Sequence, residues 1–149
     1  MEAPLDSCKT PITIVIAEDD ADDRFLLSEA FQDHCSCIRT SFVNDGIELW
    51  EYLQNEPILP GLIITDINMP RLNGTDVLKK IKADQRLMNI PIIMFTTSAE
   101  EDLIAKAYCI GANSFIRKPT TFDDLKNIVD LISRYWCEIV LLPKKECET

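Results

Sequence analysis

Charged and hydroxyl side chains follow several apolar segments of this sequence at the point where each segment ends. Glu18-Asp19-Asp20 follows one segment, Asp66 a second, Thr96 a third and Lys118 a fourth. Carboxylates form acyl phosphates in phosphoryl transfer, and a positioned cation and hydroxyl stabilise the charge of the transferring group. If the fold brings these segment ends together, the residues form a site for phosphoryl transfer.

The carboxylates of Glu18, Asp19 and Asp66 need a nearby cation if they are to lie side by side. Two like charges about 4 Å apart repel each other by about 1 kcal/mol in water and about 4 kcal/mol near a protein surface. An open cluster of oxygen ligands favours Mg²⁺ (or Mn²⁺), which keeps several waters and accepts phosphate oxygens. We therefore predict a divalent-metal site with Asp66 as nucleophile, Lys118 offsetting the phosphoryl charge and Thr96 offering a hydroxyl.

The elements that must position these residues alternate along the chain. Apolar, β-branched runs cover 12–17, 62–64, 92–95 and 114–116, and 38–43 alternates apolar and polar residues as a strand does. Helical patterns cover 21–31, 47–53, 77–81, 103–108 and 125–132. Strands that are apolar throughout indicate a parallel sheet covered by helices on both faces. The sequence therefore predicts an α/β fold with a doubly wound, five-stranded parallel sheet of flavodoxin-like order. In such sheets ligands bind at the carboxyl ends of the strands, where the charged residues lie.

The composition excludes several classes of protein. The chain has 149 residues, 46% of them hydrophobic, which is enough for the core of one domain. With 15 basic and 25 acidic residues the formal net charge is −10, so we expect no nucleic-acid partner. No apolar run approaches the roughly 18 residues of a membrane span, and residues 1–10 lack the layout of a signal peptide. We expect a cytoplasmic protein without a membrane partner.

The six cysteines contain no Cys-x-x-Cys pair, and the one histidine, His34, adjoins Cys35. Cys35 and Cys37 are too close together for ordinary zinc-finger spacing. We therefore interpret the cysteines as reduced thiols, several of them in the core, rather than as metal ligands or disulfides. We interpret His34, at the end of the first predicted helix beside Asp33, as a surface residue. A nucleophilic His–Cys pair is disfavoured, since the two are neighbours in sequence with no third group to orient them.

Four motifs occur in an order that is highly specific. They are Ala17-Glu18-Asp19-Asp20, Thr65-Asp66-Ile67-Asn68-Met69-Pro70 with Gly74, Thr96-Thr97-Ser98, and Gly111-Ala112-Asn113 with Arg117-Lys118-Pro119. Through them the chain, from about Ile12 to Trp136, resembles the receiver domain of bacterial two-component response regulators. The resemblance implies Mg²⁺-dependent acceptance of a phosphoryl group from a sensor histidine kinase or a His-phosphotransfer protein.

The resemblance also implies roles for individual residues. Asp66 is the phospho-acceptor, and Glu18 and Asp19 form the acidic pocket, with Asp19 as a direct metal ligand. The backbone carbonyl of Asn68 supplies a further ligand, and Lys118 pairs with the phosphate.

Two further residues are implied to form the switch. Thr96 provides the switch hydroxyl, and Phe115 stands where the family keeps a rotating aromatic residue, often tyrosine. Phenylalanine can swing inward but has no hydroxyl for a surface contact. The resemblance also implies that the Lys118–Pro119 bond is cis, a form that about 5–6% of X–Pro bonds adopt.

A closer likeness is to the single-domain regulators paired with bacterial phytochromes and similar hybrid kinases. It rests on residues 95–98, on Tyr108 with 111–113, and on the ending 135–143. The likeness implies an N-terminal extension (1–11), a receiver domain (12–136) and a C-terminal extension (137–149) without an output domain.

An apolar run, Ile139-Val140-Leu141-Leu142, lies in that C-terminal extension. Since we expect no output domain, phosphorylation must be read as a change in surface. We predict a homodimer through the face of the fourth helix, fifth strand and fifth helix together with this run. The alternative is that the run folds back as a local strand or packs on the fifth helix.

Two other functions fit parts of the pattern. Haloacid-dehalogenase-like phosphatases also phosphorylate an Asp, but they need a second Asp where this chain has Asn68, which cannot act as an acid–base group. An interaction module that has lost signalling is disfavoured, because every site position holds a competent residue. We therefore expect no enzyme in the ordinary sense, but a regulator that catalyses only its own phosphorylation and dephosphorylation.

Overall fold

The computed structural model describes residues 11–32 and 38–144 of the chain. The predictions for His34 and for Cys8, Cys35, Cys37 and Cys147 lie outside the described residues. Among the described residues, Cys109 is exposed and Cys137 is half-buried, and neither forms a disulfide. Burial raises the pKa of Cys137 to about 11, which makes it a poor nucleophile.

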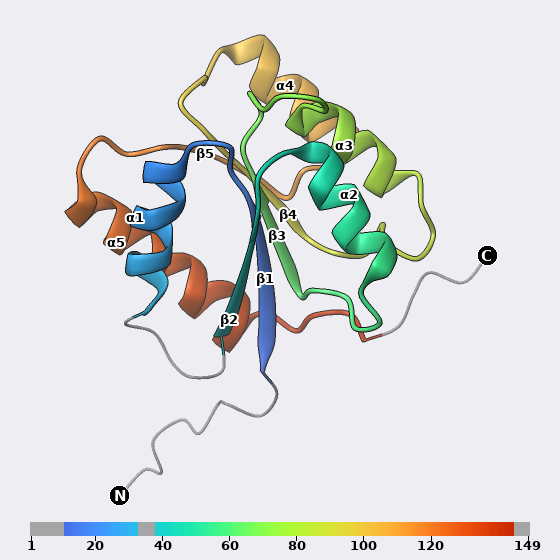
Figure 1. The fold of residues 1–149 in the computed structure, drawn as a ribbon, viewed down its shortest axis with the longest axis horizontal. Coiled ribbons are helices and arrows are strands. Elements are labelled where there is room, and N and C mark those ends of the chain that lie inside the picture. Colours follow the sequence, from blue (N-terminus) through green and yellow to red (C-terminus); the bar gives the residue numbers. More distant parts are fainter. Residues whose placement is uncertain (1–10, 33–37, 145–149) are drawn as a thin grey trace, which may run out of the picture.

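Within the described ranges, parallel strands form one sheet in the order β2-β1-β3-β4-β5 (Figure 1). The strands are β1 Ile12–Ala17, β2 Ile38–Val43, β3 Leu62–Thr65, β4 Ile92–Thr96 and β5 Ser114–Arg117. This order confirms the predicted doubly wound, flavodoxin-like fold. The direction of winding reverses between β1 and β3, so a crevice opens between the carboxyl ends of these two strands.

Helices cover both faces of the sheet (Figure 1). They are α1 Ala21–Gln32, α2 Gly46–Asn55, α3 Gly74–Lys82, α4 Glu101–Ile110 and α5 Phe122–Ser133. Val15 of β1 packs in the core beneath α2, α3 and α4, whereas Ile14 and Ile16 pack in the core beneath α1 and α5. Because both faces are covered, alternate residues of the strand are equally buried, and the strand reads as a continuous apolar run.

Side-chain caps fix where several helices begin, α3 and α5 among them. Asn73 accepts a hydrogen bond from the Asp76 amide at 2.9 Å, and Thr121 accepts one from the Asp124 amide at 3.1 Å. Such caps satisfy amides that have no partner within the helix. α3 and α5 therefore begin ahead of the apolar positions from which we predicted them.

A π-helical segment, η1 (Arg134–Ile139), continues the chain beyond α5. The Val140 amide ends it by donating to the Tyr135 carbonyl at 2.8 Å. The chain then runs past the amino ends of the strands, where a Leu142 methyl group lies beside Gly61 (Figure 1). Ile139 and Leu141 stay 68% and 96% exposed, so this run is neither a strand nor fully packed.

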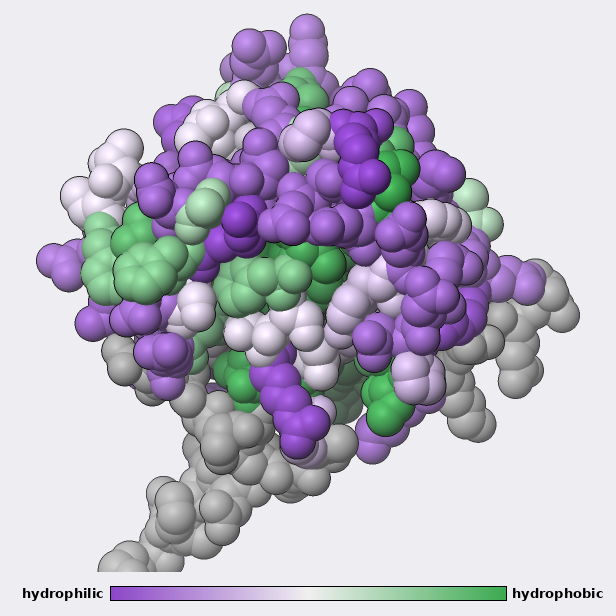
Figure 2. All heavy atoms as spheres, in the orientation of Figure 1, coloured by the Kyte–Doolittle hydropathy of each residue, from purple (hydrophilic) through white to green (hydrophobic). Residues whose placement is uncertain are grey.

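The surface is mostly hydrophilic, with hydrophobic side chains gathered over part of α1 and α5 (Figure 2). On these helices Phe25 and Leu131 are each 63% exposed. No helix in the described ranges is both long enough and apolar enough to cross a membrane.

Candidate functional site

The predicted site residues meet at the carboxyl edge of the sheet. Glu18 directly follows β1, Asp66 follows β3, Thr96 ends β4 and Lys118 follows β5. The sheet order makes β1, β3, β4 and β5 consecutive neighbours, so their ends adjoin. The fold thus brings together residues that are up to 100 positions apart in sequence.

Three carboxylates form an acidic cluster at this edge. Glu18, Asp19 and Asp66 each offer one oxygen, and these oxygens lie within 4.8 Å of one another. Glu18 and Asp66 are buried, whereas Asp19 is exposed. Burial raises the pKa of Glu18 to about 7, against the opposing effect of Lys118. Oxygen ligands of this kind and number, open to solvent on one side, fit a hard divalent cation.

Lys118 neutralises part of this charge. Its Nζ lies 2.6 Å from Glu18 Oε2 and 2.7 Å from Asp66 Oδ2. A third carboxylate, that of Asp23 in α1, lies 3.1 Å away. Burial alone would lower the pKa of Lys118, but the hydrogen bonds to Asp66 and Glu18 raise it above its ordinary value. Sequence reasoning did not include Asp23 among the site residues.

The peptide bond between Lys118 and Pro119 is trans, so the expectation of a cis bond was wrong. The trans form is the intrinsically favoured one for X–Pro bonds. With this trans bond the ammonium still reaches its carboxylate partners, and the Lys118 amide donates to the Thr96 carbonyl at 2.8 Å. The lysine is therefore anchored at both its backbone and its side chain.

The remaining side of the site is formed by hydroxyl and amide groups. Thr96 is fully buried, and its Oγ1 accepts a hydrogen bond from the Ser98 amide at 3.3 Å. The side chain of Asn68 donates to Ser98 Oγ at 2.9 Å, which joins the loop after β3 to the loop after β4. The Ile67 amide donates to Asp66 Oδ1 at 2.6 Å and thereby fixes the carboxylate. Sequence reasoning did not foresee the contact to Ser98.

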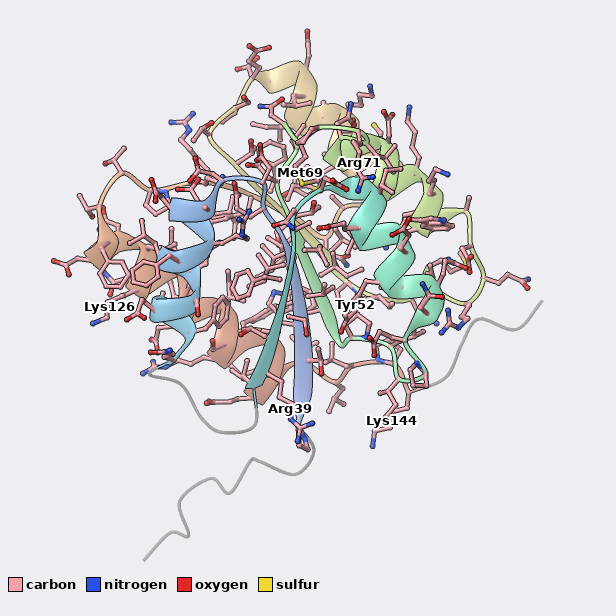
Figure 3. The ribbon with its side chains drawn as sticks, in the orientation of Figure 1. Arg39, Tyr52, Met69, Arg71, Lys126 and Lys144 are labelled. Atoms are coloured by element: carbon pink, nitrogen blue, oxygen red, sulfur yellow. The ribbon has the colours of Figure 1, made fainter. Side chains whose placement is uncertain are left out.

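The loop that carries Asp66 and Asn68 is held by its neighbour. Arg71, in this loop, donates to both carboxylate oxygens of Asp45 in the loop between β2 and α2 (Figure 3 labels Arg71 at the carboxyl end of the sheet). The Gly46 amide donates to the Leu72 carbonyl at 3.1 Å. A Cβ at Gly46 would lie 2.1 Å from that carbonyl oxygen, so only glycine allows the two loops to approach this closely.

Phe115, the predicted aromatic switch residue, is half-buried on β5 and packs against the core beneath α2, α3 and α4. Its backbone amide donates to the hydroxyl of Tyr108 in α4 at 3.1 Å. We predicted that Phe115 itself lacks a hydroxyl for surface contacts. The structure supplies a phenolic hydroxyl from α4, and sequence reasoning gave no sign of this contact.

A match to a known protein family covers most of the chain. Residues 14–130, more than half of the chain, match the family described as the response regulator receiver domain. The chain belongs to this family. Receiver domains are signalling domains of two-component phosphorelay systems, and histidine kinases or phosphotransfer proteins phosphorylate them. The family thus confirms the resemblance and the class of function predicted from the motifs.

Individual relatives of this receiver domain are regulators of similar length. Response regulator Rcp1 of Synechocystis sp. is 31% identical over 144 residues, which cover 93% of this chain and 97% of Rcp1. The probable methanogenesis regulatory protein FilR2 of Methanothrix harundinacea is 33% identical over 130 residues, covering 85% of this chain and 84% of FilR2.

Solved structures agree with this assignment. The phosphorylated cyanobacterial phytochrome response regulator RcpA superposes with a TM-score of 0.86 at 32% identity, covering 91% of this chain and 100% of RcpA. The Mn²⁺-bound form of Rcp1 superposes with a TM-score of 0.83 at 30% identity, covering 89% of this chain and 99% of Rcp1. The fold of this chain is therefore that of these response regulators.

Proposed function

We propose that this protein is a response regulator that accepts a phosphoryl group on the carboxylate of Asp66. The observation that carries the proposal is the contact of 2.7 Å between Asp66 Oδ2 and Lys118 Nζ at a buried strand end. Asp66 belongs to the acidic cluster and follows β3. Beside β3 in the sheet lies β4, which ends in Thr96. Lys118 would offset the charge of the phosphoryl oxygens, and the Thr96 hydroxyl would donate a hydrogen bond to one of them.

The proposed reaction depends on a divalent cation, Mg²⁺ or Mn²⁺. Carboxylate oxygens of Glu18, Asp19 and Asp66 and the backbone carbonyl of Asn68 would hold it. Support comes from the acidic cluster, whose oxygens lie within 4.8 Å of one another, and from the Mn²⁺-bound form of Rcp1. When bound, the cation supplies charge neutralisation for the incoming phosphoryl group.

The proposed donor is a sensor histidine kinase or a His-phosphotransfer protein. A hollow between α1 and α5 lies next to Lys118 and is lined largely by apolar side chains, among them Leu26 and Phe122. Together with the exposed Phe25, it offers a donor protein an apolar surface beside the reacting carboxylate. We propose no activity on other substrates, because Asn68 stands where a phosphatase of the haloacid-dehalogenase type needs an acid–base Asp.

We further propose that this is a stand-alone regulator, which signals through its own surface. Residues 12–136 would form the receiver unit, and 137–149 an extension used for homodimerisation. Phosphorylation would draw Thr96 toward Asp66 and let Phe115 move inward, which changes the surface of α4, β5 and α5. The exposed side chains of Ile139 and Leu141, in the segment after α5, would add an apolar contact to this pairing and favour a two-fold homodimer.

Mass spectrometry after incubation with acetyl phosphate and Mg²⁺ tests the central proposal. We expect a single, labile addition of one phosphoryl group in the wild type and in Asp76→Asn, which changes an acid of α3 outside the cluster. Asp66→Asn should take up none. Labelling of Asp66→Asn at the wild-type rate would identify another nucleophile and refute the proposal.

A further inference from the structure

The ammonium of Lys118 has three carboxylate partners within hydrogen-bond distance. Nζ lies 2.6 Å from Glu18 Oε2, 2.7 Å from Asp66 Oδ2 and 3.1 Å from Asp23 Oδ2. An ammonium has three N–H donors and no acceptor, so these contacts occupy all its donors. The Lys118 side chain is 10% exposed, which leaves little access for water to replace a lost partner.

Asp23 differs from the other two partners of Lys118 because its carboxylate is neither a proposed metal ligand nor the proposed phospho-acceptor. Glu18 and Asp66 belong to the acidic cluster, and Asp23 does not. In the proposed reaction, Glu18 is a metal ligand and Asp66 forms a bond to phosphorus, so both change their contacts with Lys118. Of the three partners, Asp23 alone is free to hold the ammonium throughout.

The first turn of α1 fixes the place of Asp23. Its amide donates to Asp20 Oδ1 at 3.0 Å, and Arg24 Nη1 donates to the Glu18 carbonyl at 2.8 Å, which ties this turn to the acidic cluster. Asp23 also shares a helix face with the buried Leu27, four residues later. One oxygen of its carboxylate therefore reaches Lys118 at the sheet edge, while the side chain as a whole stays 42% exposed.

We propose that Asp23 is a positioning residue that holds the Lys118 ammonium beside Asp66 during phosphoryl transfer. This role rests on the proposed function. When an acyl phosphate reacts, an Asp66 carboxylate oxygen forms a bond to phosphorus, and the bond from phosphorus to the acyl oxygen breaks. The donor's carboxylate leaves with the bonding electrons, and Lys118 keeps its protons while donating hydrogen bonds to phosphoryl oxygens. An ammonium held in place by Asp23 rearranges less to make these bonds.

A pair of matched variants isolates this role. Asp23→Asn removes one charge next to Lys118, and Asp22→Asn removes the same charge from the adjacent, exposed residue, which does not contact Lys118. With acetyl phosphate and saturating Mg²⁺, we expect Asp23→Asn to take up phosphate about fivefold more slowly than Asp22→Asn, the effect of losing one partly exposed charged hydrogen bond. Asp23→Glu, which retains a carboxylate, should recover most of the lost rate.

Nuclear magnetic resonance of the lysine ammonium groups gives a second readout that does not depend on metal or activity. In metal-free protein, we expect the Lys118 ammonium protons to exchange with water faster in Asp23→Asn than in Asp22→Asn. Equal rates of phosphate uptake in the two asparagine variants would overturn the role of Asp23 alone. A wild type that takes up no phosphate would overturn the proposed function, and the role of Asp23 with it.

Discussion

Arg71 donates two hydrogen bonds to Asp45, from Nε to Oδ2 at 2.8 Å and from Nη2 to Oδ1 at 3.2 Å. To make this contact, Arg71 adopts a φ of 67°, a left-handed conformation that costs a side-chain-bearing residue about 1 kcal/mol or more. Arg71→Ala and Arg71→Gly both remove the ion pair, but only glycine relieves the backbone. We expect Arg71→Gly to be up to about 1 kcal/mol more stable than Arg71→Ala in urea unfolding. Equal stabilities would show that the backbone at this position carries no strain.

The same ion pair should make stability depend on acidity. Burial alone would raise the pKa of Asp45, but hydrogen bonds from Arg71 and from the Glu48 amide hold it below its usual range. Because the pKa is lower in the folded state, the stabilisation is fully present above about pH 4, the pKa of an unfolded aspartate, and is lost as the pH falls through the folded value. The stability difference between wild type and Arg71→Ala should therefore shrink below pH 4. Arg39→Ala, at the opposite end of the sheet (Figure 3), should give a difference that does not change with pH.

Metal affinity should depend on the exposed member of the acidic cluster. Asp19→Asn removes one charged ligand, and we expect divalent-metal affinity in calorimetry to fall about tenfold or more. Asp22→Asn, which removes an equal charge nearby, should lower affinity much less. If the two variants bind Mn²⁺ equally well, Asp19 is not a ligand.

The lifetime of the phosphorylated protein should depend on Thr97. This residue is exposed and directly follows Thr96, where a side chain can hinder the approach of water to a phosphorylated Asp66. Thr97→Ala should therefore shorten the phosphorylated lifetime, by about threefold if one side chain blocks part of the in-line path. Decay after removal of the donor measures this, and an unchanged or longer lifetime would mean that Thr97 points away from the phosphoryl group.

Self-association should depend on the exposed side chains after α5. Sedimentation of the wild type should shift toward dimer when beryllofluoride mimics the phosphoryl group. Replacing Ile139 and Leu141 by lysine should weaken the dimer about tenfold or more. Ile58→Lys, at a site 81% exposed in the loop before β3, is the matched control and should have no effect. A wild type that stays monomeric in both states at high micromolar concentration would rule the dimer out.

Much of the fold and part of the site could be predicted because they depend on local patterns. The run around Val15 is apolar at every position, which indicates a strand buried on both faces. Glu18, Asp66 and Lys118 each directly follow a strand, so the order of the strands was enough to bring them together. The metal-ligating role of the Asn68 carbonyl stays a prediction.

Other contacts depend on backbone and side-chain geometry that cannot be predicted from the order of apolar and polar residues. Arg71 pairs with Asp45, 26 residues away in sequence, and adopts a left-handed backbone conformation to do so. That conformation is not predicted for a residue other than glycine, so nothing in the sequence indicated the pair. Asp23 was not predicted as a site residue, because acids are common in the first turn of any helix. A signal was present, however, because Asp23 precedes the apolar Leu27 and Ala30 by four and seven residues and therefore lies on the inward face.

The hydrogen bond from the Phe115 amide to the Tyr108 hydroxyl has a consequence for how other chains can approach. β5 is an edge strand, and an edge strand with free amides is a template for pairing with an extended segment of another protein. Here the phenol of α4 occupies the amide in the second position of β5, so an added strand would first have to displace it. This contact makes the β5 edge a poorer template for β-augmentation and for edge-to-edge aggregation.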